Sequence, residues 1–191
     1  PSEVLVIADQ TANPKFIAAD LLSQAEHGND SQVVFITNSP AILEATKAEV
    51  AIQLAALPRK EFAKNSLENS TAILVNSLSE AMNISNSYAP EHLILAVSDP
   101  EPLASAVENA GSVFLGHYSP ESAGDYSSGT NHTLPTSGFA RGWSGVSTLS
   151  FMKTITFQQL SKSGLMAISD ATATLARAEG LEGHARAIEV R

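Results

Sequence analysis

The sequence predicts an α/β fold: a mostly parallel, incomplete Rossmann-like sheet with helices on both faces. Two observations predict this class. Short aliphatic runs without polar alternation are typical of strands buried on both faces of a parallel sheet. Between these runs, apolar residues recur with helical spacing, and such alternation favours parallel strands joined by crossover helices. A third observation, the abundance of glycine and serine after Gly116, predicts a long Gly/Ser-rich loop followed by a helical C-terminal tail.

The expected elements alternate along the chain. Strands are expected at residues 3–8, 32–37, 72–75, 93–97 and 112–116. Helices are expected at residues 14–26, 40–57, 59–68, 78–87 and 101–110. Asn13 followed by Pro14 is a typical helix start, because the asparagine caps the helix and proline suits its first turn. Gly28 and Pro58 are typical stops for the first two helices.

Residues 117–148 are expected to form the long loop. A loop of this length within a compact domain is usually either disordered or functional. Aromatic and histidine side chains scattered through it favour an ordered, functional loop. They are Tyr118, Tyr126, His132, Phe139 and Trp143.

The last part of the chain predicts a separate helical region. Residues 149–160 have no clear periodicity, whereas residues 164–179 have the spacing of an amphipathic helix that ends at Gly180. We therefore expect two domains, residues 1–148 and residues 149–191.

Composition excludes several classes of function. The chain has 191 residues, a formal net charge of −9 and no cysteine. Without clusters of Lys and Arg it does not favour nucleic acid as a partner. No apolar run is long enough to span a bilayer and no signal-peptide pattern is present, so we expect no membrane association and a cytoplasmic location. Because a strand follows Pro1 almost at once, we expect the chain to be part of a longer polypeptide.

An acid and an imidazole lie side by side in the segment SYAPEHLILAV. Glu91 and His92 separate a proline from an apolar run that predicts a buried strand. Such a pair is either a solvated edge of the strand or a place where protons move. No Gly-rich nucleotide-binding loop and no nucleophile elbow occur anywhere in the chain. The residues alone therefore predict an α/β domain with an acid–imidazole pair.

Other polar residues have a spacing that suits a metal ion. Gln24 and His27 are three residues apart near a helix end, so their side chains share one face. A polar helix terminus is the commoner explanation of that pattern. Asp125 and His132 lie in the Gly-rich loop, where an aspartate more often caps a turn. His184 follows AEGLEG in the tail, where a lone histidine is usually exposed.

Several longer motifs jointly resemble the C-terminal part of histidinol dehydrogenases. They are PSEVLVIAD, ADLLSQAEHG, YAPEHL, NAGSVFLG, YSPESAGDYSSGTNHTLPTSGFAR and EGLEGHARA, and the resemblance extends from residue 1 to residue 191. The resemblance implies a zinc-dependent homodimer that oxidises L-histidinol to L-histidine through histidinal, with two NAD molecules, in the last step of histidine biosynthesis. It implies that the NAD site lies in an N-terminal half absent from this chain, so the chain alone should be inactive.

The resemblance also implies roles for individual residues. Glu91 and His92 match the two catalytic bases. The positions that match the zinc ligands are Gln24, His27, Asp125 and His184. The positions that match substrate-binding residues are Ser2, Gln24, His27, His92, Asp125, Glu179 and His184. In the family the tail is exchanged between subunits, so Glu179 and His184 should complete the partner's site. His132 is expected to support the site, and His117 is expected to be a surface residue.

The implied chemistry suits these residue types. His92 would take the hydroxyl proton as hydride leaves carbon, and Glu91 would activate the water that hydrates the aldehyde. Zinc would hold the imidazole and amine of the substrate, and manganese suits the same nitrogen and oxygen ligands. Two alternatives stay open: a zinc hydrolase that uses water activated by Glu91, and a remnant without catalytic activity.

Overall fold

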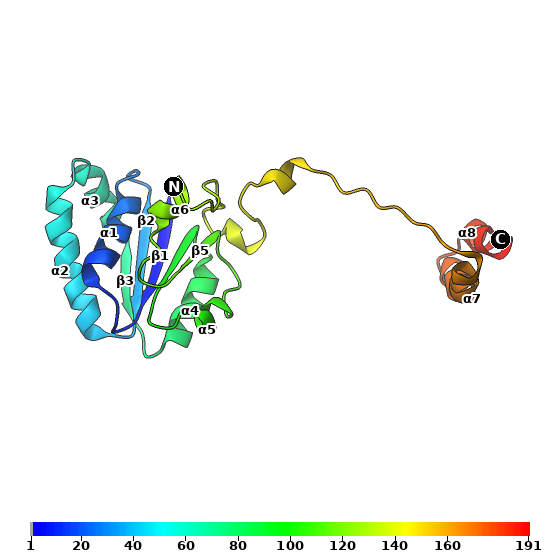
Figure 1. The fold of residues 1–191 in the computed structure, drawn as a ribbon, viewed down its shortest axis with the longest axis horizontal. Coiled ribbons are helices and arrows are strands. Elements are labelled where there is room, and N and C mark those ends of the chain that lie inside the picture. The colour runs from blue at the N-terminus through cyan, green and yellow to red at the C-terminus, as the bar shows by residue number, and fades with distance from the viewer. Residues whose placement is uncertain (1) are drawn as a thin grey trace. The chain divides into compact units, whose positions relative to one another are not determined.

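A five-stranded parallel sheet forms the centre of the first of two units, Pro1–Phe151 and Met152–Arg191. The structure is a computed structural model that describes residues 2–191. The strands are β1 (Glu3–Ala8), β2 (Gln32–Thr37), β3 (Thr71–Leu74), β4 (His92–Ala96) and β5 (Ser112–Leu115). Their order in the sheet is β3-β2-β1-β4-β5 (Figure 1). The predicted α/β class with a parallel sheet is confirmed.

Helices cover both faces of this sheet (Figure 1). They are α1 (Pro14–Ala25), α2 (Pro40–Ala56), α3 (Lys60–Glu68), α4 (Leu78–Tyr88) and α5 (Glu101–Ala104). Side chains of α1, α2 and α3 pack with Val4, Val6 and Ile94 on one face. Side chains of α4 pack with Leu5, Ile7 and Leu93 on the other face. Successive residues of a strand point to opposite faces, so uninterrupted aliphatic runs are required here.

One expected helix is much shorter than its sequence suggests. The prediction of a helix at 101–110 is wrong beyond Ala104, where α5 ends. The reason is tertiary: the Asn86 side-chain oxygen on α4 accepts a hydrogen bond of 2.9 Å from the backbone N–H of Glu108. The Asn109 side chain in turn donates to the Asn86 carbonyl at 3.0 Å. These bonds replace the partners that a continued helix would provide.

The expected long loop contains a short helix, α6 (Glu121–Tyr126), and a 3-10 turn, η1 (Phe139–Arg141). The prediction of a continuous loop over residues 117–148 is therefore wrong for these two segments. Gly124 lets α6 lie close to the sheet, because a Cβ there would be 2.6 Å from Cε1 of Phe114 on β5. The loop is also tied to β1, since the backbone N–H of Ser137 donates to Oε1 of Glu3 at 2.7 Å.

The second unit contains two helices, α7 (Lys162–Ala178) and α8 (Glu182–Glu189). A 3-10 turn, η2 (Thr148–Phe151), closes the first unit. Gly180 has φ +76°, a left-handed conformation that glycine adopts without strain and that turns the chain between α7 and α8. Arg177 forms ion pairs with Glu182 and Glu189, which join the two helices. The helical C-terminal end is confirmed, and the expected exchange of this region between subunits stays a prediction.

Within the described part of the chain, none of the helices combines the length and the apolar character needed to cross a bilayer.

Candidate functional site

The main chain at the start of β1 holds both members of the acid–imidazole pair. The N–H of Glu3 donates to Oε2 of Glu91 at 2.9 Å, and the carbonyl of Glu3 lies 3.0 Å from Nδ1 of His92. β1 and β4 are neighbours with Val4 opposite His92, which brings these groups together. The solvated explanation of the pair is thereby excluded, since Glu91 and His92 are 8% and 3% exposed.

This contact determines the proton position on the His92 ring. A backbone carbonyl only accepts hydrogen bonds, so Nδ1 must carry the proton that it donates to Glu3. In the neutral ring Nε2 is then an unprotonated acceptor. Nε2 is buried and has no hydrogen-bond partner. The ring thus presents a nitrogen atom without a hydrogen bond, 3.7 Å from Oδ1 of Asp125.

The turn before β4 is held in a strained and closely packed conformation. Ala89 has φ +59°, which is unusual for a residue with a side chain. The carbonyl of Glu91 accepts from the N–H of Ser112 at 2.9 Å, and a Cβ on Gly111 would lie 2.5 Å from the same oxygen. A glycine at this position therefore lets the start of β5 approach the acid–imidazole pair.

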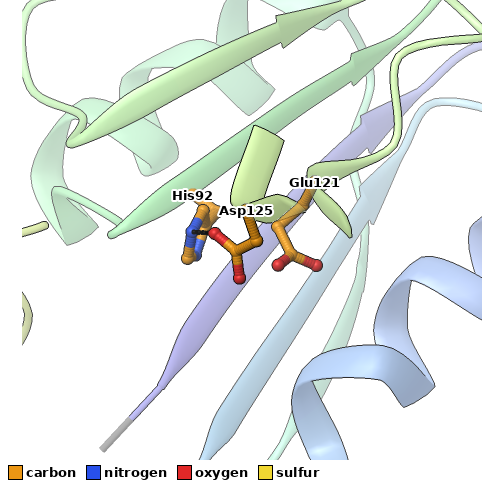
Figure 2. A group of neighbouring side chains, drawn as sticks. All are labelled: His92, Glu121 and Asp125. Atoms are coloured by element: carbon orange, nitrogen blue, oxygen red, sulfur yellow. Dashed lines mark ion pairs between the residues drawn. The ribbon is translucent and has the colours of Figure 1, made fainter. Parts of the chain in front are cut away.

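Helix α6 brings two further carboxyl groups to His92. Glu121 and Asp125 are four residues apart, so they share one face of the helix. Figure 2 shows the Asp125 carboxyl group facing the His92 ring and the Glu121 carboxyl group beside that of Asp125, and Nε2 of His92 lies 3.7 Å from Oδ1 of Asp125. The potential ligand atoms of the three residues all lie within 4.8 Å of one another. Nδ1 of His132 is 3.1 Å from the same Asp125 oxygen, as a supporting role for that histidine would require.

The C-terminal end of α1 adds an uncharged polar group. Gln24 is 0% exposed, and neither atom of its amide has a hydrogen-bond partner of ordinary geometry. The amide is nevertheless near enough to the Glu121 carboxyl group to lower its pKa. Its neighbour Ser23 donates from Oγ to Oε2 of Glu121 at 3.1 Å. Unpaired buried polar atoms are rare in folded proteins, so they indicate a group that the site is built to bind.

The electrostatics of the cluster also indicate a cation. Burial raises the pKa of Glu91, although the N–H of Glu3 and the His92 ring oppose the rise. Burial and then Asp125 raise the pKa of Glu121. Burial and the charge of Glu121 raise the pKa of Asp20 to about 7. Several carboxyl groups are therefore concentrated where a divalent ion would neutralise them.

The structure brings together only part of the predicted ligand set. Among residues 2–191 the only group of three potential His and carboxylate ligands is His92, Glu121 and Asp125. Of the four predicted zinc ligands it contains Asp125 alone. The His27 ring is exposed and lies with Nδ1 3.0 Å from Oγ of Ser2. Ser2 and His27, which the resemblance assigned to one substrate site, are thus in contact with each other.

The predicted residues of the tail belong to the second unit. Glu179 follows the last residue of α7 and His184 lies on α8. Both side chains are exposed on that unit. Their assignment to a metal and substrate site stays a prediction.

Two features of the site differ from the sequence-based expectation. His117, expected at the surface, is half-buried, and its Nε2 lies 3.1 Å from Oγ1 of Thr11. Glu121 was not predicted at all. Its spacing of four residues from Asp125 in ESAGDY was the available signal, but it has meaning only if these residues form a helix, and a loop was expected there.

The chain matches the family model of histidinol dehydrogenase over residues 1–191. The chain belongs to the histidinol dehydrogenase family. It is 56% identical over 191 residues to histidinol dehydrogenase of Pseudoalteromonas translucida (strain TAC 125), covering 100% of this chain and 44% of that protein. It is 56% identical over 192 residues to the chloroplastic histidinol dehydrogenase of Oryza sativa subsp. japonica, covering 100% of this chain and 41% of that protein.

A solved histidinol dehydrogenase has the same fold. The crystal structure of the enzyme from Elizabethkingia anophelis superposes with a TM-score of 0.96 at 55% identity. The superposition covers 100% of this chain and 44% of that one. The chain therefore spans less than half the length of the histidinol dehydrogenases that it matches.

Proposed function

We propose that this chain is the part of a histidinol dehydrogenase that binds and deprotonates the substrate. The whole protein would oxidise L-histidinol to L-histidine through histidinal, with two NAD molecules, in the last step of histidine biosynthesis. The observation that carries the proposal is the buried Glu91–His92 pair, which the main chain of Glu3 holds with Nε2 of His92 free. NAD would bind outside this chain, in a further part of the polypeptide.

His92 is the base for the alcohol. Oxidation of a primary alcohol requires loss of the hydroxyl proton as hydride leaves carbon, and an imidazole is suited to accept that proton near neutral pH. The carbonyl of Glu3 keeps the proton on Nδ1, so Nε2 is available for the substrate. Such a base contributes about 10²–10⁴-fold to the rate.

Glu91 is the base for the second oxidation. An aldehyde gives up a second hydride only after it is hydrated, so a water molecule must lose a proton to an adjacent base. Burial raises the pKa of Glu91, and a carboxylate with a raised pKa is a stronger base than an exposed one. Two successive oxidations at one carbon would therefore use two neighbouring bases of different chemistry.

A divalent metal ion, zinc in the first instance, fits the donor groups of this cluster. Gln24 has two unpaired buried amide atoms, and the side chains of Gln24 and Asp125 both influence the pKa of Glu121. Nitrogen and oxygen donors without thiolate suit zinc and also manganese. We assign the ion to Gln24, His27 and Asp125 of one subunit and to His184 of the partner subunit. When bound, it would supply positive charge and hold the amine and imidazole of the substrate.

The remaining substrate contacts follow from the same arrangement. Ser2 and His27 form a polar pair near the start of β1, and His92 and Asp125 face each other across the cluster. Glu179 and His184 would come from the exchanged tail of a homodimer. Glu179 would accept a hydrogen bond from the substrate imidazole. We place the enzyme in the cytoplasm, where its NAD-dependent reaction has its coenzyme.

The test is a steady-state assay of the full-length gene product that contains this sequence. We expect two molecules of NADH for each L-histidinol consumed, and none from the 191-residue chain alone. NADH formation by the short chain would refute the proposed location of the NAD site. Ester or amide cleavage without NADH would support a zinc hydrolase instead.

A further inference from the structure

Glu3 has a side chain that the proposed function leaves without a role. Its main chain holds the acid–imidazole pair, but its carboxyl group accepts, through Oε1, the backbone N–H of Ser137 at 2.7 Å. Glu3 is 6% exposed, and a buried carboxylate is costly unless it is hydrogen-bonded. Its Oε2 is buried without a hydrogen-bond partner, so the bond to Ser137 is the contact that compensates for burial. Hydrogen bonds to a carboxylate are roughly twice as strong as those between neutral groups.

Ser137 lies in a loop whose two ends are joined to each other. The backbone N–H of Val146 donates to the carbonyl of Thr133 at 3.0 Å. Within the loop, Ser137 has φ +57° and the following Gly138 has φ +76°. The left-handed conformation is strained for Ser137, which has a side chain, so this turn needs support from outside the loop. The bond from Glu3 supplies that support.

A neighbouring residue of the same loop reaches the acid–imidazole pair from the side of α6. Nδ1 of His132 lies 3.1 Å from Oδ1 of Asp125, and Figure 2 shows the Asp125 carboxyl group facing the His92 ring. The side chain of His132 is 65% exposed and that of Asp125 is 5% exposed. The His132 ring therefore lies on the solvent side of this carboxyl group.

Leu134 reaches the pair from a third side, at the start of β5. A Cβ built on Gly111 would lie 3.2 Å from Cβ of Leu134 and 2.5 Å from the carbonyl oxygen of Glu91. Leu134 is thus separated from the Glu91 main chain by the width of one glycine. The loop therefore contacts three residues that surround the acid–imidazole pair, which are Glu3, Gly111 and Asp125.

We propose that Glu3 is a positioning residue: its carboxylate anchors the loop at Ser137, so that the loop closes over the acid–imidazole pair and retains the aldehyde between the two oxidations. This inference depends on the proposed function, because only two successive oxidations leave an aldehyde to retain. In the first, the alcohol loses a hydride to NAD and a proton to His92. The resulting histidinal must stay until water activated by Glu91 hydrates it. A loop held open would let it diffuse away before the second oxidation.

The experiment measures histidinal release by the full-length gene product, with semicarbazide present to trap free aldehyde. The wild type should give two molecules of NADH for each L-histidinol and almost no trapped aldehyde. Glu3→Ala removes the acceptor of the Ser137 N–H, so histidinal should be released about 10–100-fold more often and the yield of NADH should fall below two. Hydrogen exchange at the Ser137 amide should become faster by a similar factor. Glu101→Ala, at an exposed glutamate on α5, is the matched control and should change neither.

Glu3→Gln distinguishes the hydrogen bond from the charge. The side-chain oxygen of glutamine also accepts a hydrogen bond, so this variant should retain histidinal nearly as well as the wild type. If Glu3→Gln released as much histidinal as Glu3→Ala, the anchoring bond would not be the cause. Should Glu3→Ala fail to fold, Leu134→Ala loosens the same loop at its contact with Gly111, and about threefold to tenfold more release is expected.

The remaining outcomes separate this inference from the proposed function. Faster exchange at Ser137 in Glu3→Ala without more trapped histidinal would overturn the retention role and leave the proposed function in place. A lower kcat with an unchanged yield of NADH would also overturn it, because Glu3 would then act on the bases and not through the loop. Unchanged exchange at Ser137 would refute the anchor. Absence of NADH formation by the wild type would refute the proposed function, and this inference with it.

Discussion

The two edges of the sheet hold polar residues of the same types in opposite conditions. At the carboxyl edge, Asp9 accepts hydrogen bonds from the backbone N–H groups of Thr11 at 2.8 Å and of Ser98 at 2.9 Å. Burial alone would raise the pKa of Asp9, but these bonds outweigh it and lower the pKa below its usual value. At the amino edge, burial raises the pKa of Glu91, and Nε2 of His92 has no hydrogen-bond partner.

This difference between the two edges points to a ligand site at the amino edge, whereas the fold class would suggest the carboxyl edge. Open α/β sheets usually bind ligands at the carboxyl ends of their strands, and strand order here reverses between β1 and β4. In this chain the Asp9 carboxylate at that edge is fully hydrogen-bonded, although Nδ1 of His117 there has no hydrogen-bond partner, whereas at the amino edge Nε2 of His92 has none. Unsatisfied buried groups are rare, and a basic nitrogen among several carboxyl groups is one that a bound group would satisfy. The comparison therefore favours the amino edge, and substitutions on the two edges should differ in kind.

The largest difference in kcat is expected between substitutions of His92 at the amino edge and of His117 at the carboxyl edge. His92→Asn removes the proposed base for the alcohol, so kcat for L-histidinol oxidation should fall about 10²–10⁴-fold. His117→Asn, at the carboxyl edge, removes a ring that contacts Thr11 and should change kcat less than about twofold. NADH formation by the full-length gene product measures both. Equal losses would show that the edges do not differ as proposed.

Substitution of Glu91 should affect the two oxidation steps unequally, whereas substitution of Asp9 should affect neither. Glu91→Gln should slow oxidation of histidinal about 10²-fold or more while the alcohol step is affected less, because only the aldehyde needs activated water. Single-turnover assays with each substrate measure the two steps. Asp9→Asn, the carboxyl-edge counterpart, should lower the free energy of unfolding by about 1 kcal/mol and leave both steps unchanged. A loss of the alcohol step alone in Glu91→Gln would reverse the assignment of the bases.

Close packing at the amino edge should be sensitive to a single methyl group. Gly111→Ala would place Cβ 2.5 Å from the Glu91 carbonyl, so the free energy of unfolding should fall by about 1–3 kcal/mol. Gly142→Ala is the matched control, since a Cβ there meets no atom within 4 Å. Urea denaturation followed by circular dichroism measures both variants. If the two changed equally, the close approach of β5 to Glu91 would be of no energetic consequence.

An effect that depends on pH is expected at Asp20, whose pKa is raised from 3.8 to about 7 by burial and by Glu121. Between these values the folded chain keeps a proton that the unfolded chain loses, so stability falls as pH rises from about 4 to about 7. Asp20→Asn removes this loss. In the absence of metal it should match the wild type near pH 4 and exceed it by about 1–3 kcal/mol near pH 8.

Urea denaturation at several pH values measures this difference. Asp99→Asn, at an exposed position, should follow the wild type at every pH. A constant gain for Asp20→Asn from pH 4 to pH 8 would show that the effect of the substitution does not come from ionisation.

The sequence by itself determined the local structure and those candidate site residues that are neighbours in the chain. Uninterrupted aliphatic runs predicted the strands, because the middle of a strand buried on both faces favours apolar residues. The adjacency of Glu91 and His92 was visible because it depends on neighbouring residues, whereas the shared role predicted for Gln24 and His27 stays a prediction, since Gln24 is buried and His27 is exposed. Periodicity failed at residues 105–110, where a side chain from α4 competes with the helix.

Only the tertiary structure decided how these signals combine. The carbonyl that sets the proton on His92 comes from Glu3, 89 residues earlier, and the partner of Ser23 is Glu121, 98 residues later. Such contacts depend on which strands pair and on how closely α6 packs against the sheet, which neighbouring residues do not encode. The physical reason is that burial and hydrogen bonding are properties of the packed chain, so a group without a partner is recognised only once its surroundings are assembled.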